Sequence, residues 1–497
     1  MADDTAHRSD PTGDEASTIR LSLTLPGSAS LGAFQGGATA ALAVVMNSLR
    51  SRGHTVHVDA VGGASAGSIV AMLFVHCLAA GRDASSMLRR AWVDEVDMDL
   101  LRTGGGGAPL AFDDLRSELI DFLDDTERHP YGVHEPIGSP ISVHVGLTTL
   151  LGFTTPIVTG GTASSTLTYT DWLAFEVEPR SGREALTQPE NGSMLDAVLV
   201  SASHPAAFAP RSLDRSADRD SYERRGITNF PPEGVVWYTD GGLVESEPVG
   251  RILEASRART AVDDPSLRLH VVVDPRSSGP GAGRRWSDAD ADPSWLDGVT
   301  RALSVLPTQA LHDDLRAISE VNERLEGLDD LMNDLRDRLG DDAGDVGRRI
   351  AELAGIADKE HVDVAVISPL LQADGSDAGV GELLAGDFVG AFGGFLDREI
   401  RRSDFALGWS CTRIWVDDHL EKRGVARDDV DAVLATLDAA GEMNSDDIVV
   451  SHDSVAELSW SGRWRLALLA MRVGHVLTRE AIPSPAELVR RRRKPSR

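Results

Sequence analysis

The hydrophobic pattern of the first 80 residues alternates between strands and helices. Apolar and polar residues alternate over Ile19–Leu25, and a second apolar segment covers Val56–Val61, which predicts two strands. Apolar residues at helical spacing over Leu31–Leu49, and again from about Ser65 to Ala80, predict two helices. A chain that alternates in this way builds a parallel sheet covered by helices. We therefore expect an α/β fold with a mostly parallel central sheet.

Apolar segments further along the chain predict that this sheet continues. The later strand candidates are Ile141–Leu147, Leu167–Phe175, Val235–Tyr238, Leu269–Val273 and Val362–Ile367. The last of these, within 361–368, comes after a long helical segment. We expect it to return to the main sheet, so that the α/β domain, placed at 19–275, is discontinuous in sequence.

Composition separates other segments from this domain. Leucine and isoleucine at helical spacing among many charges predict a helical insertion at 296–357, with one or two long amphipathic helices. Asn322 and Asp329 interrupt its heptad pattern, which disfavours a dimeric coiled coil. The remaining predicted segments are a disordered leader at 1–18, a Gly-, Pro-, Ser- and Asp-rich linker at 276–295, a helical C-terminal region at 380–488 and a basic tail at 489–497.

The charge balance narrows the classes of partner. Asp and Glu number 78 against 49 Lys and Arg, so the formal net charge of the 497 residues is −29, and we expect no nucleic-acid partner. No basic segment followed by an apolar one marks a signal peptide, and the apolar stretches are short or interrupted. We therefore expect a cytoplasmic protein. The basic run Arg490–Lys494 suits either a transient peripheral contact with an anionic membrane or a solvated tail.

The sharpest chemical signal is the turn Gly63-Ala64-Ser65-Ala66-Gly67, which matches G-x-S-x-G. A serine at a sharp strand-to-helix turn needs very small neighbours, here Gly63 and Gly67, because strand and helix approach closely. Such a turn exposes the serine Oγ at a helix N-terminus, where the helix dipole favours a developing negative charge. Ser65 is thus a candidate nucleophile. The alternative is a Gly/Ala turn that only packs a helix against a sheet.

A nucleophilic serine also needs a base. None of the 14 histidines has a distinctive setting, and we interpret the three that come closest as structural: His204, His270 and His361. Asp240, in contrast, ends a predicted strand and precedes Gly241 and Gly242, so its carboxylate can face a cleft without steric cover. The alternative for Asp240 is an ordinary Asp-Gly turn.

The loop at 26–32, between the first strand and the first helix, consists almost entirely of small residues. Small residues allow backbone N–H groups to point into a cavity at a helix N-terminus. A phosphate-binding loop would need G-x-x-x-x-G-K-[ST], but Ala33 and Phe34 follow Gly32, so the lysine and the hydroxyl are missing.

These three parts, in this order, resemble the patatin-like phospholipase family. The family pattern is a glycine-rich loop after the first strand, then G-x-S-x-G, then D-G-G or D-G-A far downstream. The corresponding segments here are GSASLG at 27–32, GASAG at 63–67 and DGG at 240–242. Residues 201–210 also resemble the family's A-S-x-A-x-P-x-x-F-x-P stretch, and 244–249 the run after its aspartate. Phe388–Gly408 resembles the C-terminal region of a bacterial patatin-related subgroup.

The resemblance implies a patatin-like three-layer fold and a lipid acyl hydrolase that cleaves carboxylic esters. Ser65 would attack the ester carbonyl, and Asp240 would take its proton without a histidine. Backbone N–H groups of Gly27, Ser28 and Ala29 would form the oxyanion hole. The implied partner is a lipid ester substrate, and no metal or other cofactor is implied. An aspartate with an ordinary pKa of about 3.9 is a weak base at neutral pH, so the dyad needs a partly dry site.

The oxyanion loop departs from the family's G-G-G-x-R-G. Ser28 and Ala29 replace two glycines, and Leu31 replaces the arginine. Serine and alanine can supply the N–H donors only if the loop needs no positive φ at their positions. The missing arginine bears on phospholipid preference more than on ester hydrolysis.

Three alternatives stay open at this point. One is acyl transfer, or hydrolysis of an ester that is not a phospholipid. The second is a catalytically degenerate patatin-like scaffold that binds lipid or a protein partner. The third is a histidine-dependent α/β-hydrolase.

Overall fold

The computed structural model describes most of the chain. The described residues are 17–102, 108–111, 113–159, 162–187, 193–244, 248–261, 264–276, 295–339, 343–357, 359–372, 383–386, 391–441 and 458–481. The leader, the linker and the basic tail predicted from the sequence lie wholly or almost wholly outside these residues, as does the run Arg490–Lys494.

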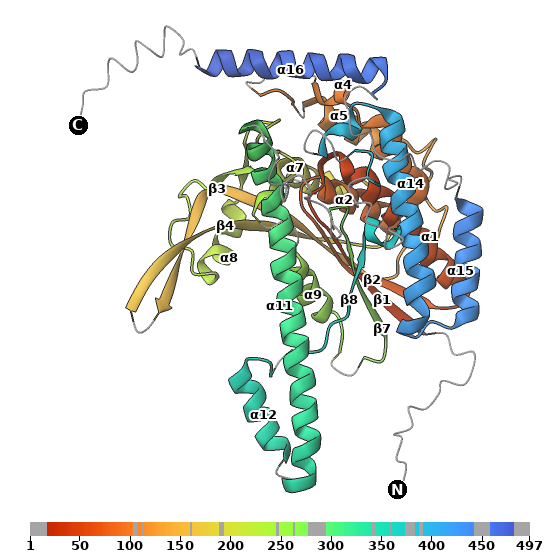
Figure 1. The fold of residues 1–497 in the computed structure, drawn as a ribbon, viewed down its shortest axis with the longest axis vertical. Helices are drawn as coiled ribbons and strands as arrows, with labels where there is room; N and C mark the ends of the chain where they lie inside the picture. Colours follow the sequence, from red (N-terminus) through yellow and green to blue (C-terminus); the bar gives the residue numbers. More distant parts are fainter. Residues whose placement is uncertain are drawn as a thin grey trace, which may run out of the picture.

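Within the described residues, eight strands form one sheet, in the order β5-β6-β3-β2-β1-β7-β8 with β4 paired to β3 off this path (Figure 1). The strands are β1 (Thr18–Leu25), β2 (Thr55–Gly63), β3 (Ile141–Thr159), β4 (Thr162–Val177), β5 (Arg211–Asp214), β6 (Val235–Thr239), β7 (Leu267–Val273) and β8 (Val364–Ile367). Strands β3, β2, β1, β7 and β8 are parallel neighbours, whereas β4 and β6 run antiparallel to β3. The predicted α/β class with a mostly parallel sheet is confirmed.

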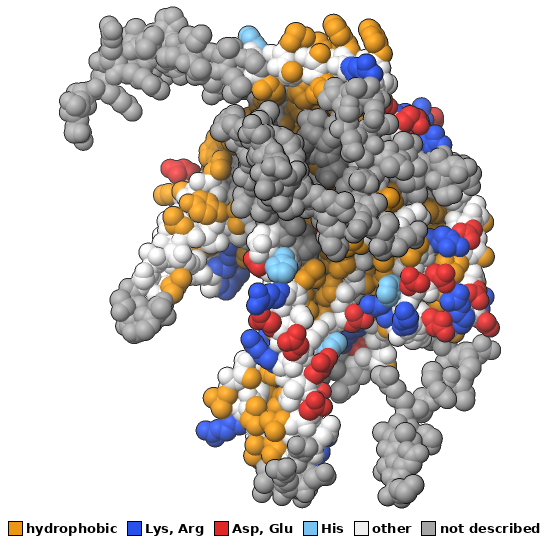
Figure 2. Space-filling view, viewed as in Figure 1, with side chains coloured by type: hydrophobic (Ala, Val, Ile, Leu, Met, Phe, Trp, Pro, Cys, Tyr) orange, Lys and Arg blue, Asp and Glu red, His pale blue; other side chains and the backbone are white. Residues whose placement is uncertain are grey.

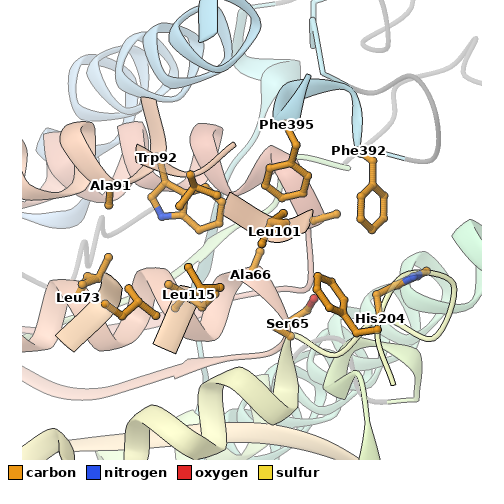
Figure 3. A pocket seen from close by; sticks show the side chains of 16 residues that line it. Ser65, Ala66, Leu73, Ala91, Trp92, Leu101, Leu115, His204, Phe392 and Phe395 are labelled. Atoms are coloured by element: carbon orange, nitrogen blue, oxygen red, sulfur yellow. The ribbon is translucent and has the colours of Figure 1, made fainter. Parts of the chain in front are cut away.

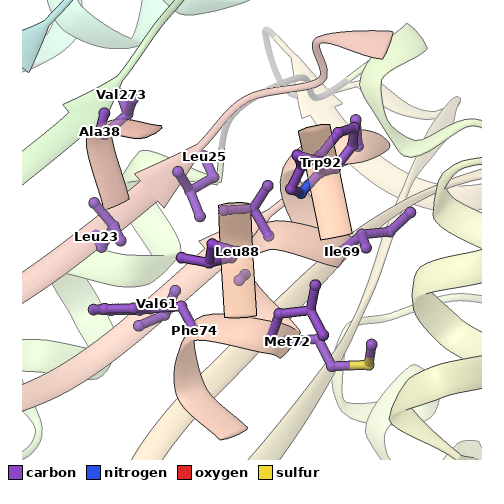
Figure 4. Packing of buried hydrophobic residues seen from close by; sticks show 14 of the residues in the cluster. Leu23, Leu25, Ala38, Val61, Ile69, Met72, Phe74, Leu88, Trp92 and Val273 are labelled. Carbon is purple, nitrogen blue, oxygen red and sulfur yellow. The ribbon is translucent and has the colours of Figure 1, made fainter. Parts of the chain in front are cut away.

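Helices cover both faces of this sheet because successive strand residues point to opposite sides. Val271 and Val273 of β7 face the main core, whereas Val272 between them joins a second cluster. The main core contains the helices α1 (Gly32–Ser51), α2 (Ala66–Ala80) and α7 (Met194–Ser201), and the second cluster contains α9 (Val249–Arg257) and α11 (Trp295–Leu339). Figure 4 shows the main core, where Leu23 and Val61 of two strands lie near Phe74 of α2.

The C-terminal helix α14 (Arg398–Trp415) packs closely on α1. A Cβ on Gly37 would overlap the carbonyl oxygen of Phe405, and one on Gly408 would overlap that of Phe34, so two glycines allow the backbones to meet. By length and composition, Ala29–Ser51 could cross a membrane, but 89% of its most apolar window is buried inside the protein. A helix that packs in the core of a protein is buried in this way. A further helix, α15 (Arg427–Ala440), also contacts α1.

The helical segment between β7 and β8 forms a hairpin of α11 and α12 (Ala343–Ala354), which projects from the body (Figure 1). The heptad break at Asn322 has a structural role. Its side-chain amide donates to the carbonyl of Val362 at 2.8 Å and accepts the N–H of Val362 at 3.0 Å. This residue therefore fixes α11 to the chain just before β8.

The hairpin of β3 and β4 is longer than the sequence predicts. Pairing continues from Phe153 opposite Thr168 to Thr159 opposite Thr162, beyond the predicted Ile141–Leu147 and Leu167–Phe175. This outer part is rich in threonine and serine and mostly exposed. It lacks the apolar alternation of a half-buried strand, so hydrophobic periodicity does not mark it.

Several further elements belong to the described structure. Those that precede β3 are α3 (Ala84–Arg89), the π-helical turn η2 (Arg90–Glu95), α4 (Met98–Arg102) and α5 (Asp113–Asp124). Two short helices, α6 (Glu184–Thr187) and α8 (Arg219–Arg224), lie between strands. The one-turn helices η4 (Gly241–Leu243) and η8 (Gly393–Phe395) and the long helix α16 (Trp460–Ala481) follow later in the chain.

Candidate active site

Ser65 sits on the sharp turn between β2 and α2 and has a strained backbone. Its φ of 51° and ψ of −131° lie in a region that non-glycine residues rarely adopt. A Cβ on Gly63 would overlap the backbone of Gly67, and one on Gly67 would overlap the carbonyl oxygens of Leu25 and Pro26. The two glycines of the motif thus allow the close approach that places Ser65 at the N-terminus of α2.

Asp240 follows β6 and faces Ser65 across the end of the sheet. The Oγ of Ser65 donates a hydrogen bond to Oδ2 of Asp240 at 2.6 Å, and the N–H of Gly242 donates to Oδ1 at 2.7 Å. Gly241 is needed for the same turn, because a Cβ there would overlap the carbonyl oxygen of Gly146. The structure therefore brings together the serine and the aspartate proposed from the sequence, with the two glycines after the aspartate in supporting positions.

The carboxyl group of Asp240 is 2% exposed. Burial raises the pKa of Asp240 above its usual value, while the nearby His204, the hydroxyl of Ser65 and the N–H of Gly242 act in the opposite direction. Loss of solvation destabilises the charged carboxylate and makes it a stronger base. The site therefore has the dry environment that a Ser–Asp pair requires.

Ser201, at the end of α7, holds the backbone of Ser65 in place. The N–H of Ser65 donates to Oγ of Ser201 at 2.8 Å, and that hydroxyl donates to the carbonyl of Gly146 at 2.7 Å. The sequence interpretation gave this serine no role. The available signal was its place at the start of the family-like stretch 201–210.

The small-residue loop runs beside Ser65, and Ala29 lines the same pocket. The condition stated from the sequence, that the loop needs no positive φ at Ser28 and Ala29, holds at Ser28, with a φ of −141°, but not at Ala29, with a φ of 49°. Gln35 of α1 supports the loop: its Oε1 accepts from the Ser28 hydroxyl at 2.7 Å, and its Nε2 donates to the carbonyl of Pro26 at 2.8 Å. Gly27 is buried in the same loop, and Leu31, in place of the family arginine, is fully buried.

The C-terminal part of the chain also supports this loop. The Ser30 hydroxyl donates to the carbonyl of Ala391 at 2.6 Å and accepts the N–H of Gly394 at 3.0 Å. Arg401, 2% exposed, donates to the carbonyls of Gly394 and Val93, each at 3.0 Å. The predicted site residues all precede residue 243, so their spacing does not reveal this support.

An apolar pocket of about 620 Å³, its open mouth included, begins at Ser65 (Figure 3). Ser65 and His204 lie at one end, and Leu73 and Ala91 at the other. Its walls are almost entirely hydrophobic side chains from six segments. They come from α2 (Ala66, Ile69, Leu73), from η2 and the residue after it (Ala91, Trp92, Val96), from α4 (Leu101), from α5 (Leu115, Leu119), from the stretch after α7 (Ala202, Phe208) and from the segment at η8 (Phe392, Phe395). A pocket with walls of this polarity suits a hydrocarbon group better than a polar ligand.

Of the three histidines interpreted as structural, His204 lines the pocket. Burial lowers its pKa, although the charge of Asp240 acts in the opposite direction, and its ring makes an edge contact with Phe392 at 5.6 Å. His270 is buried within β7, where desolvation lowers its pKa to about 4, and His361 is exposed. His204 is therefore the histidine to test beside the Ser–Asp pair.

Among the residues that the structure describes, no group of three or more His, Cys, Asp or Glu side chains could hold a metal ion.

Residues 23–252 match the patatin-like phospholipase family, which confirms the resemblance drawn from the motifs. The uncharacterized membrane protein Rv3479 of Mycobacterium tuberculosis is 27% identical over 296 residues, which are 55% of this chain. The chain spans only 26% of that protein. The crystal structure of VipD from Legionella pneumophila aligns over 95% of this chain and 93% of its own, with a TM-score of 0.28 and 12% identity.

Proposed function

Because residues 23–252 carry a patatin-like phospholipase domain, we propose that this protein is a lipid acyl hydrolase that cleaves carboxylic esters with Ser65 as nucleophile and Asp240 as base. The observation that carries the proposal is the 2.6 Å hydrogen bond from the Ser65 hydroxyl to the buried Asp240 carboxylate. A degenerate scaffold would not need to keep a strained serine and a buried carboxylate in contact. The Ser65–Asp240 hydrogen bond and the glycines beside these two residues therefore support catalysis rather than binding alone.

The reaction proceeds in two halves. Ser65 Oγ attacks the ester carbonyl carbon while its proton moves to Oδ2 of Asp240. The tetrahedral oxyanion is held by backbone N–H groups of the loop at Gly27, Ser28 and, with the strained backbone that its positive φ requires, Ala29. Each such donor contributes about 2.7–4 kcal/mol to transition-state stabilisation. The intermediate collapses to acyl-Ser65, and Asp240 returns the proton to the departing alcohol. A water molecule then attacks the acyl-enzyme, with Asp240 taking and returning its proton, and the carboxylic acid leaves.

The hydrophobic pocket supports an acyl chain as the group bound beside Ser65. The chain would extend from Ser65 along Ile69 and Leu73 toward Ala91. Burial of each methylene contributes about 0.8 kcal/mol, so affinity would grow with chain length until the pocket is filled. Because Leu31 is buried where the family has an arginine, the substrate class is defined by its acyl ester rather than by a phosphate group.

A serine-reactive fluorophosphonate probe tests the proposal directly. The intact protein should be labelled and should hydrolyse p-nitrophenyl esters, and Ser65→Ala should lose both properties. The matched control is Ser86→Ala, which removes an exposed serine from α3. No labelling and no hydrolysis by the intact protein would favour the binding scaffold instead.

A further inference from the structure

The C-terminal helix α16 presents a row of apolar side chains to solvent. Trp460 is 81% exposed, Trp464 56% and Met471 60%. Their spacing of four and seven residues places them on one side of the helix. The two indole rings stack in parallel with their centroids 6.3 Å apart. Figure 2 shows this hydrophobic row along the outer edge of α16. Exposed tryptophan at this density is uncommon on a surface that faces only water.

The charge of this helix is opposite to that of the protein. The helix α16 contains four arginines and one acidic residue, Glu480, whereas the whole chain has a net charge of −29. The arginines within this segment are Arg463, Arg465, Arg472 and Arg479. A helix that combines exposed tryptophan with an excess of arginine over acidic residues has the composition of helices that lie in the interface of an anionic bilayer.

The opposite side of α16 is fixed to the segments that cover the pocket. Leu466 and Leu469 pack against the main core. Arg465 forms ion pairs with Asp97 and Asp99 at 2.8 and 2.7 Å and donates to the carbonyl of Leu396 at 3.2 Å. Asp97 follows Val96 and Leu396 follows Phe395, and both Val96 and Phe395 line the pocket. A surface that binds the outer side of α16 therefore lies next to the pocket that begins at Ser65.

We propose that α16 is a membrane-docking helix, and that its partner is a bilayer with anionic lipids. Trp460, Trp464 and Met471 enter the boundary between headgroups and acyl chains, while Arg463 and Arg472, which flank this row, contact lipid phosphates. Each arginine near an anionic surface contributes about 1 kcal/mol. The inference deepens the proposed function and rests on it, because docking next to the pocket serves a lipid substrate.

Vesicle co-sedimentation tests the docking separately from catalysis. All variants carry Ser65→Ala, so no lipid is consumed. The protein should sediment with vesicles of phosphatidylcholine and phosphatidylglycerol, and less with phosphatidylcholine alone. Trp460→Ser with Trp464→Ser should weaken sedimentation about tenfold or more. The matched control is Leu353→Ser, which removes an 84% exposed leucine from α12, at the far end of the molecule from α16 (Figure 1).

Activity measurements on the proteins with Ser65 intact complete the test. The double tryptophan variant should hydrolyse a soluble p-nitrophenyl ester at the normal rate but lose activity on esters embedded in vesicles. Equal sedimentation of the variant and the parent, or no sedimentation of the parent, would overturn the docking role. A parent that is dimeric in light scattering, with a monomeric tryptophan variant and no vesicle binding, would assign the row to a second copy of the chain. Loss of soluble ester hydrolysis in every protein, with docking intact, would count against the proposed function alone.

Discussion

The N–H of Ser65 donates to the Oγ of Ser201, 136 residues away in sequence, at 2.8 Å. Because Ser65 has a φ of 51°, its strained turn depends on such contacts to keep its shape. Ser201 is thus a positioning residue for the nucleophile.

Replacing Ser201 should affect the chemical step more than substrate binding. In Ser201→Ala we expect kcat for a p-nitrophenyl ester to fall about 10- to 100-fold with little change in KM, since the nucleophile loses its alignment. The matched control is Ser203→Ala, whose hydroxyl donates to the carbonyl of Leu199 in α7. Equal effects of the two substitutions would indicate a general structural role.

Asp240→Asn should abolish activity without loss of stability. Loss of a general base typically costs about a thousandfold in rate. The pKa of Asp240 is raised in the folded protein, so its ionisation above the unfolded pKa lowers the free energy of unfolding at neutral pH. The neutral amide removes that cost, so Tm at pH 7 should be equal or higher. A clear fall in Tm would contradict the inferred pKa direction.

The matching histidine substitution separates a dyad from a histidine-dependent hydrolase. In His204→Gln we expect kcat to change by less than about tenfold, because the Ser65 proton already has an acceptor in Asp240. The substitution keeps a polar side chain of similar size at the pocket wall. A loss as large as that of Asp240→Asn would show that the histidine belongs to the catalytic machinery.

The length of the pocket should set acyl-chain preference. Ala91→Leu places a larger side chain at the end opposite Ser65, so long chains should lose binding space. We expect the ratio of kcat/KM for p-nitrophenyl palmitate over butyrate to fall about tenfold or more. The rate on the butyrate ester serves as the internal control. An unchanged ratio would mean that the chain binds elsewhere.

Asp274, just after β7, should give the protein a pH-dependent stability. Burial raises the pKa of Asp274 to about 6, although the N–H and charge of Arg276 oppose the shift. Its contribution to stability is present below the unfolded value of 3.8 and is lost as the pH rises through about 6. Tm should therefore fall less between pH 5 and pH 8 in Asp274→Asn than in the parent. An identical fall in both proteins would contradict the shift.

The sequence predicted the class of the fold well because parallel strands and their helices are strongly apolar. The turn at Ser65 and the loop at Ala29 were visible because small residues cluster there. Spacing along the chain could not predict the contact from Ser201 to Ser65 or the role of Arg401, since both depend on how distant segments pack. The positive φ of Ala29 was also hidden, because alanine seldom marks such a backbone.

The contact between α1 and α14 ties the family-matched segment, residues 23–252, to the C-terminal part of the chain. A protein truncated to residues 23–252 would lack β7, which pairs with β1. It would also lack α14, which packs against α1 at Gly37 and Gly408. Such a truncation would leave the apolar back of α1 open to water. Recombinant work on this enzyme candidate should therefore retain the chain through α14, although the residues that carry the chemistry end much earlier.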